Sequence, residues 1–280
     1  MTQAVSLERP IGVFDSGVGG LTVLQALRAQ LPHHDFIYFA DTARVPYGRK
    51  PREMVREFAQ QITAFLLQQD VQSIVIACNT ASSAALPELA DETPVPVWGV
   101  IEPGVEAARR ATKSGRVGVI GTRGTIASGA YQQRLERAGL TVWGRACPMF
   151  VHLVEEGLAE SDEAEVLARH YLGDHPSIDT LILGCTHYPI LRGVVGRALG
   201  PEVTLVGSDI VTAELVHDAL RANGSLRESG RPGRVLHYVT GDPLAYRHTA
   251  AVIGGTEGEI VPLDVTSLAS AVSMAVDERR

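Results

Sequence analysis

Residues 73–80 read SIVIACNT, and residues 180–187 read TLILGCTH. Each segment is a short apolar run that ends in a cysteine and small polar residues, which is typical of a buried parallel strand followed by a turn. At nearly the same spacing, IGVFDSGVGG at residues 11–20 falls beside VGVIGTRGTI at residues 117–126. Two matching pairs in the same order predict a duplicated α/β unit, with chance similarity between buried strands as the alternative.

The rest of the chain alternates short apolar runs with segments of helical spacing, such as residues 21–31 and 128–138. This alternation predicts an α/β protein with two doubly wound parallel-sheet domains, related by pseudo-twofold symmetry, and a site in the cleft between them. The last part of the chain has no counterpart in the repeat, so we expect it to complete the first sheet. The expected domains are residues 10–103 plus 211–270, a discontinuous unit, and residues 104–210.

The composition excludes several classes of protein. Of the 280 residues, 45% are hydrophobic and 20% are charged, which is enough apolar material for a core. A formal net charge of −7 argues against nucleic-acid or anionic-membrane binding. The start MTQAVSLERP does not resemble a signal peptide, and there is no long apolar window, so we expect a cytoplasmic protein without a transmembrane helix. Three cysteines are too few for a disulfide scaffold and predict free thiols.

Cys78 and Cys185 end the two matching strands, at the sheet edge where ligands bind in α/β folds. The residues after them begin a helix or turn, whose free N–H groups favour anions, and we expect this position to lower the pKa of each thiol. Either cysteine alone is more readily explained as a small buried hydrophobe. The matched pair favours a catalytic role. Cys147 matches nothing and is expected to be structural.

Three kinds of chemistry fit these residues. Cys185 and His187, with Cys78, could ligate a metal, but the spacing is unlike that of zinc sites, and we expect no metal. Cys185 and His187 could also form a nucleophile and base, which leaves Cys78 unexplained. Two thiols that face each other across a cleft suit the inversion of a stereocentre, in which one removes a proton and the other delivers one to the opposite face. No lysine-centred motif implies pyridoxal phosphate.

Other loops follow predicted strands but are less decisive. Asp15 and Ser16 begin a glycine-rich turn. This turn either caps a helix or places a carboxylate (Asp15) and a ligand-binding hydroxyl (Ser16) near Cys78. Residues 121–125 (GTRGT) take the matching place in the second unit. The turn lacks the spacing of a phosphate loop. Residues 41–48 form either a proline-containing turn or an anion site made by backbone N–H groups.

Taken together, these motifs resemble those of the bacterial glutamate racemases, within the aspartate/glutamate racemase superfamily. The matching segments are DSGVGGLTV at 15–23, PYG at 46–48, ACNTAS at 77–82, GT followed by T at 121–125, and GCTHYP at 184–189. The resemblance implies interconversion of L- and D-glutamate without a cofactor, a supply of D-glutamate for peptidoglycan, and a homodimer. Its only other partner would be the small-molecule substrate. An aspartate or hydantoin racemase, or a catalytically silent binding protein of the same fold, is the alternative.

The resemblance also implies roles for single residues. Cys78 would act on D-glutamate and Cys185 on L-glutamate, with Asp15 as the polar partner of Cys78 and His187 as that of Cys185. Glu155 would be a further acid near the site, although the adjacent Glu156 leaves the alignment uncertain by one position. The residues expected to bind substrate are Asp15, Ser16, Tyr47, Gly48, Asn79, Thr80, Thr122, Thr125, Thr186 and His187.

Overall fold

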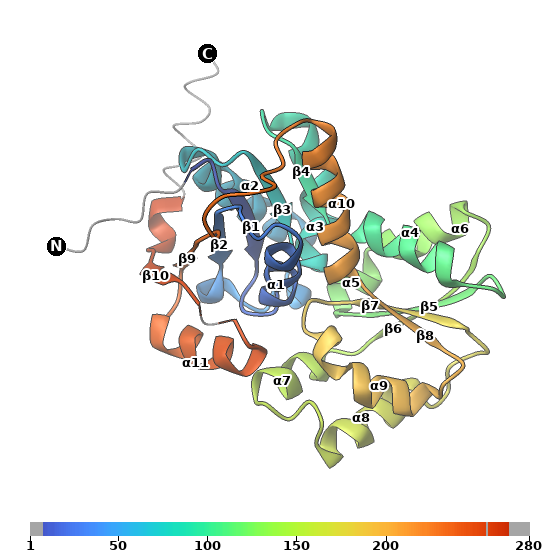
Figure 1. The fold of residues 1–280 in the computed structure, drawn as a ribbon. Helices are drawn as coiled ribbons and strands as arrows, with labels where there is room; N and C mark the ends of the chain where they lie inside the picture. Colours follow the sequence, from blue (N-terminus) through green and yellow to red (C-terminus); the bar gives the residue numbers. More distant parts are fainter. Residues whose placement is uncertain (1–7, 256, 269–280) are drawn as a thin grey trace.

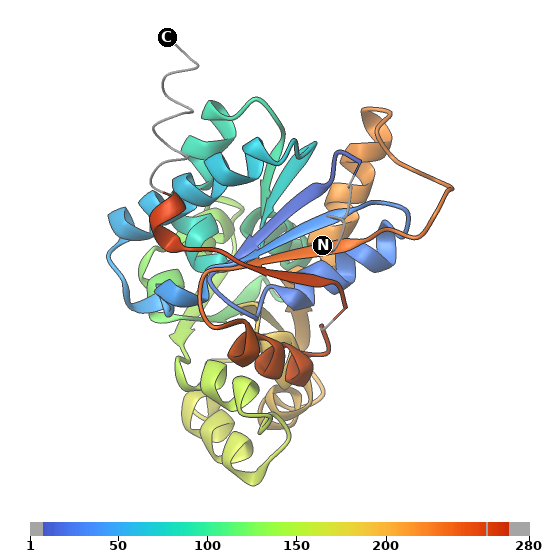
Figure 2. The same ribbon diagram turned by 90° about the vertical axis from the view of Figure 1, so that its left-hand side faces the viewer.

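The computed structural model describes residues 8–255 and 257–268 and contains two parallel sheets, which form two lobes (Figures 1 and 2). The first has the strand order β10-β9-β2-β1-β3-β4, and the second has the order β6-β5-β7-β8. The strands of the first sheet are β1 (Ile11–Asp15), β2 (Phe36–Ala40), β3 (Ser73–Ile76), β4 (Val97–Gly99), β9 (Val235–Val239) and β10 (Glu259–Pro262). Those of the second are β5 (Arg116–Gly121), β6 (Thr141–Ala146), β7 (Thr180–Gly184) and β8 (Thr204–Gly207).

The two sheets repeat one arrangement. If β9 and β10 are set aside, each sheet has its strands in the order second, first, third, fourth along the chain. The segments that match in the sequence therefore occupy equivalent places, β1 with β5 and β3 with β7. The predicted fold class is confirmed. The C-terminal strands β9 and β10 extend the first sheet beyond β2.

Helices alternate with the strands and cover both sheets. The helices are α1 (Leu21–Gln30), α2 (Arg52–Gln68), α3 (Asn79–Glu92), α4 (Ile101–Ala111), α5 (Arg123–Ala127), α6 (Ala130–Arg137), α7 (Met149–Glu155), α8 (Asp162–Leu172), α9 (Arg192–Leu199), α10 (Ser208–Ala222) and α11 (Pro243–Ile253). Among the described residues, none of these helices combines the length and apolarity needed to cross a membrane.

The chain passes between the lobes in α4 and α10. Helix α4 contacts β7 and β8 of the second sheet, whereas α10 packs along α1 of the first unit (Figure 1). We therefore propose that the domain boundaries lie near residues 103 and 211. The helix expected over residues 128–138 begins later, at Ala130, because Gly129 adopts a left-handed φ of 65° before α6.

Candidate active site

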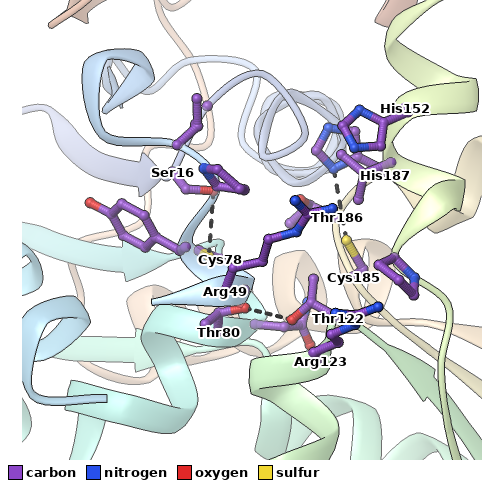
Figure 3. Close-up of a pocket in the computed structure, with 18 of the residues that line it drawn as sticks. Ser16, Arg49, Cys78, Thr80, Thr122, Arg123, His152, Cys185, Thr186 and His187 are labelled. Atoms are coloured by element: carbon purple, nitrogen blue, oxygen red, sulfur yellow. Dashed lines mark hydrogen bonds between the residues drawn. The ribbon is translucent and has the colours of Figure 1, made fainter. Parts of the chain in front are cut away.

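A cavity of about 170 Å³ lies where the carboxyl edges of the two sheets face each other (Figure 3). It is smaller than the roughly 300–1,000 Å³ of drug-sized ligand sites, so it suits a small molecule. Both halves of the chain contribute to its walls, as expected for a site in the interdomain cleft. The predicted site residues that line it are Ser16, Tyr47, Gly48, Cys78, Asn79, Thr80, Thr122, Glu155, Cys185, Thr186 and His187.

The two cysteines reach this cavity because each follows a buried central strand. Strand β3 ends at Ile76 and helix α3 begins at Asn79, which leaves Cys78 in the turn between them. Strand β7 ends at Gly184, and Cys185 comes next. Both side chains line the same cavity and are 6% exposed. The repeat in the sequence thus places two thiols at one site from opposite halves of the fold.

The Cys78 thiol is held in a form that keeps its proton. Its Sγ lies 3.8 Å from Oγ of Ser16, the acceptor of a weak hydrogen bond. Burial and the nearby negative charge of Asp15 raise the pKa of Cys78 to about 12, although the backbone N–H of Ala81 acts in the opposite direction. The expectation that the helix N-terminus lowers this pKa is therefore wrong, because the loss of hydration outweighs the helix amides.

Cys185 faces a different partner. Its Sγ lies 3.8 Å from Nδ1 of His187, and Nε2 of the same ring lies 2.9 Å from Oε1 of Glu155. Burial lowers the pKa of His187, but hydrogen bonds and negative charge from Cys185 and Glu155 outweigh it and raise the pKa to about 10. The imidazole is therefore protonated near neutral pH, and its positive charge lies beside the Cys185 sulfur. Glu156 is exposed, so Glu155 is the acid at the site.

Asp15 does not line the cavity as expected for a substrate-binding residue. The carboxyl group is buried, and its Oδ2 accepts a hydrogen bond of 2.9 Å from the backbone N–H of Gly17. Its other oxygen, Oδ1, has no hydrogen-bond partner among the described residues. The pKa of Asp15 is raised above its usual value, because the effect of burial outweighs the opposing charge of His187. Asp15 nevertheless acts on Cys78 through its charge, which contributes to the raised pKa of that thiol.

Three threonines join the halves at the floor of the cavity. Oγ1 of Thr80 lies 2.9 Å from Oγ1 of Thr122 and 3.2 Å from Oγ1 of Thr125. Thr80 belongs to the first half, and the other two belong to the second. Thr125 is fully buried and does not line the cavity, in contrast to the expectation that it binds substrate. Its contacts instead hold the other two hydroxyls in place.

The loop before α2 presents backbone to the cavity because Asp41 anchors it. The Asp41 carboxylate accepts hydrogen bonds from the Tyr47 hydroxyl, from Nε of Arg44 at 2.7 Å and from the Thr240 hydroxyl at 2.9 Å. The Tyr47 ring is buried, so the peptide that links it to Gly48 is fixed at the cavity wall. The anion site expected from this loop remains a prediction.

Three basic residues line the cavity that the sequence reasoning missed: Arg49, Arg123 and His152 (Figure 3). Arg49 and Arg123 each follow a predicted site residue, and His152 lies one helical turn before Glu155 on α7. Their proximity in the sequence to those motifs could have identified these three basic residues as candidates. Cys147 is buried and lies outside the cavity wall. Within the described residues, no cluster of three or more His, Cys, Asp or Glu side chains could hold a metal ion.

Comparison with known proteins gives a consistent result. A family model described as Asp/Glu/Hydantoin racemase matches residues 21–221. A glutamate racemase from Thermus thermophilus is 58% identical over 246 residues, which are 88% of this chain and 92% of the relative. One from Geobacter metallireducens is 46% identical over 257 residues, or 90% of this chain and 95% of the relative.

Solved structures extend this similarity to the fold. The crystal structure of the Thermus thermophilus glutamate racemase in complex with beta-chloro-D-alanine has a TM-score of 0.87 and 53% identity, over 92% of this chain and 97% of that chain. The Francisella tularensis glutamate racemase in complex with D-glutamate has a TM-score of 0.85 and 37% identity, over 94% of this chain and 98% of that chain. The chain therefore belongs to the Asp/Glu/hydantoin racemase family, among its glutamate racemases.

Proposed function

We propose that this protein interconverts L-glutamate and D-glutamate by proton transfer between the α-carbon and two cysteines, without a cofactor. The observation that carries the proposal is that Cys78 and Cys185 line one cavity from equivalent strand ends in opposite halves. Two sulfurs on opposite sides of a bound α-carbon are what inversion of that carbon requires. Glutamate as the substrate is supported by the family and by the relatives at 43–58% identity.

The charges around the two thiols assign their resting roles. Cys185 faces the protonated His187, and we assign it the role of the base that removes the α-proton from L-glutamate. Cys78, with a pKa raised to about 12, is the thiol that delivers a proton to the opposite face and yields D-glutamate. In the reverse reaction the two sulfurs exchange roles. Glu155 keeps His187 protonated and oriented, and burial together with the charge of Asp15 keeps the proton on Cys78.

The remaining polar groups are proposed to bind the substrate and stabilise the carbanion that forms at the α-carbon. Asn79 and Thr80 begin α3, where free backbone N–H groups and the helix dipole favour a carboxylate. Donors aimed at the α-carboxylate offset part of the cost of removing the α-proton. Ser16 and Thr186 line the same cavity and complete the polar contacts to the α-carboxylate and α-ammonium groups. The backbone N–H groups of Tyr47 and Gly48, with Thr122, would receive the side-chain carboxylate.

The cellular setting follows from the same resemblance. We propose that the D-glutamate product supplies peptidoglycan synthesis and that the enzyme works in the cytoplasm as a homodimer. Three free cysteines, Cys78, Cys147 and Cys185, support a reducing compartment. Sedimentation of the purified protein tests the dimer: a single species with the mass of one chain at micromolar concentration would rule it out.

The activity test uses the purified protein and L-glutamate without pyridoxal phosphate. Optical rotation should decay to zero, and a sample in heavy water should carry deuterium at the α-position of the D-glutamate formed. A constant rotation would refute the proposal. Faster decay with L-aspartate would refute glutamate as the substrate.

Variants of the three cysteines test the two-thiol mechanism. Cys78→Ala and Cys185→Ala should each abolish net racemisation, whereas Cys147→Ala should keep most of it. In heavy water, Cys78→Ala should still exchange the α-proton of L-glutamate, because Cys185 can remove a proton and return a deuteron on the same face. Exchange of L-glutamate by Cys185→Ala but not by Cys78→Ala would reverse the assignment of the two sulfurs.

A further inference from the structure

A tyrosine from the second half holds the side chain of Asn79. The hydroxyl of Tyr131, on α6, donates a hydrogen bond of 2.7 Å to Oδ1 of Asn79, and both side chains are buried, at 0% and 2% exposure. The ring fits a narrow slot. A Cβ atom at Gly104 or Gly184 would lie 3.3 or 3.2 Å from its carbon atoms. The position of the hydroxyl is therefore fixed by packing.

This hydrogen bond leaves one end of the Asn79 carboxamide free. Oδ1 accepts from Tyr131, while the buried Nδ2 has no hydrogen-bond partner among the described residues. A buried N–H group without an acceptor costs free energy, so the unbound site contains an unmet donor. Asn79 lines the cavity and begins α3, and a carboxylate bound there would supply the acceptor. If the carboxamide turned over, its oxygen would repel that carboxylate.

The geometry also fixes which atom holds the proton of this contact. Burial raises the pKa of the Tyr131 phenol, so its hydroxyl keeps its proton. Oδ1 of Asn79 is an acceptor only, and the Tyr131 hydroxyl is therefore the donor of the 2.7 Å hydrogen bond.

We propose that Tyr131 is a positioning residue for the substrate α-carboxylate: its hydroxyl fixes the Asn79 carboxamide so that Nδ2 donates to that carboxylate. The inference rests on the proposed function. Tyr131 lies in the second half and Asn79 in the first, so the donor is correctly oriented only while the two halves are together. The contact therefore couples the closed arrangement of the halves to substrate affinity.

The test compares Tyr131→Phe, Asn79→Ala and the double variant by polarimetry with both enantiomers. A hydrogen bond to a charged group corresponds to about tenfold or more in affinity, so Tyr131→Phe should raise KM for both enantiomers by roughly tenfold, with a smaller effect on kcat. Asn79→Ala should raise KM further. Because Tyr131 acts through Asn79, the double variant should be no worse than Asn79→Ala alone.

Tyr246→Phe is the matched control for loss of one buried hydroxyl. Tyr246 is 3% exposed, its hydroxyl lies 2.9 Å from Nδ1 of His237, and it does not line the cavity. We expect its KM to equal that of the unmodified enzyme. A KM for Tyr131→Phe equal to that of Tyr246→Phe, or multiplicative effects in the double variant, would overturn the role of Tyr131. Absence of racemisation by the unmodified enzyme would instead overturn the proposed function.

Discussion

Substitution of Glu155 by glutamine removes one charge from the site and little else. Gln has the same shape, and its Oε1 can still accept the hydrogen bond from Nε2 of His187, which lies 2.9 Å from the carboxylate. The change therefore isolates the effect of negative charge on the imidazolium. In the proposed reaction, a less stable imidazolium leaves less thiolate on Cys185, and removal of the α-proton from L-glutamate slows.

The size of the effect follows from the distance and the exposure. Two unit charges 2.9 Å apart attract by about 6 kcal/mol at an effective dielectric constant of about 20. The side chain of Glu155 is 35% exposed, so water screens much of that attraction, and we take about 2 kcal/mol as the remaining contribution. This corresponds to about 30-fold less of the active ion pair. We expect kcat/KM to fall by about that factor.

The fall in kcat/KM must be the same in both directions, because the two enantiomers have equal free energies in water. Polarimetry from each enantiomer checks this internally. The pH profile adds a second readout. The pKa of His187 is raised from 6.5 to about 10, so the imidazolium is present below about pH 10 and is lost above it. In Glu155→Gln the alkaline fall in rate should move to lower pH.

The same shift links His187 to stability. Because the pKa of His187 is raised on folding, its contribution to the free energy of unfolding is fully present below about pH 6.5 and is lost as the pH rises toward 10.

Glu156→Gln is the control for Glu155→Gln, since Glu156 is the exposed neighbour at the end of α7. It should match the unmodified enzyme in rate and in pH profile. Equal kcat/KM and equal alkaline limbs for the two glutamine variants would refute the reasoning.

Two further predictions concern the mouth and the wall of the cavity. Arg49 and Arg123 are expected to attract glutamate, which is anionic at neutral pH, so Arg49→Gln and Arg123→Gln should each lower kcat/KM severalfold at low ionic strength. Salt should abolish the difference, because exposed charges are screened. A loss that does not depend on salt would contradict this electrostatic attraction. Gly48→Ala should raise KM by tenfold or more, since the added Cβ would lie 2.6 Å from Cβ of Thr122. Gly196→Ala should have normal kinetics, because its Cβ would lie at an ordinary contact distance, 3.8 Å, from Cδ1 of Leu205.

The sequence predicted those parts of the site that depend on strand ends. A run of buried residues fixes where a parallel strand stops, and the next residue then lies at the carboxyl edge of the sheet. Cys78 and Cys185 follow β3 and β7 in this way, so their place in the cavity was predictable from sequence alone. The repeat added the information that both belong to one site.

The wrong predictions concern which residues form the surface of the cavity and how burial changes the pKa of Cys78. Asp15 ends β1 and Thr125 lies in α5, just after β5, but both are buried and neither lines the cavity. A motif specifies which residues lie near a site, and only packing decides which of them form its surface. The pKa of Cys78 was predicted in the wrong direction for the same reason. The helix amides are visible in the sequence, whereas the burial that outweighs them is a property of the fold.

Tyr131 illustrates a contact that the sequence does not reveal. It is 52 residues from Asn79 and lies on a helix of the other half, so their hydrogen bond exists only after the halves have assembled. The internal repeat, in which matching segments lie 106 or 107 residues apart, pairs one strand end with another. It gives no reason to expect a contact between Tyr131 and Asn79. Such partners become visible only when unpaired buried atoms are considered in the folded structure.

The unequal partners of the two thiols have a consequence for turnover. Racemisation by two thiols needs one thiolate and one thiol at the same time, because one sulfur accepts the departing proton and the other donates the arriving one. Burial and the charge of Asp15 raise the pKa of Cys78, and Cys185 lies beside the imidazolium of His187, so in the proposed mechanism the resting enzyme is ready for L-glutamate. In this proposed mechanism, the proton lies on Cys185 after one turnover, and the free enzyme must return it to Cys78 before it can act on L-glutamate again.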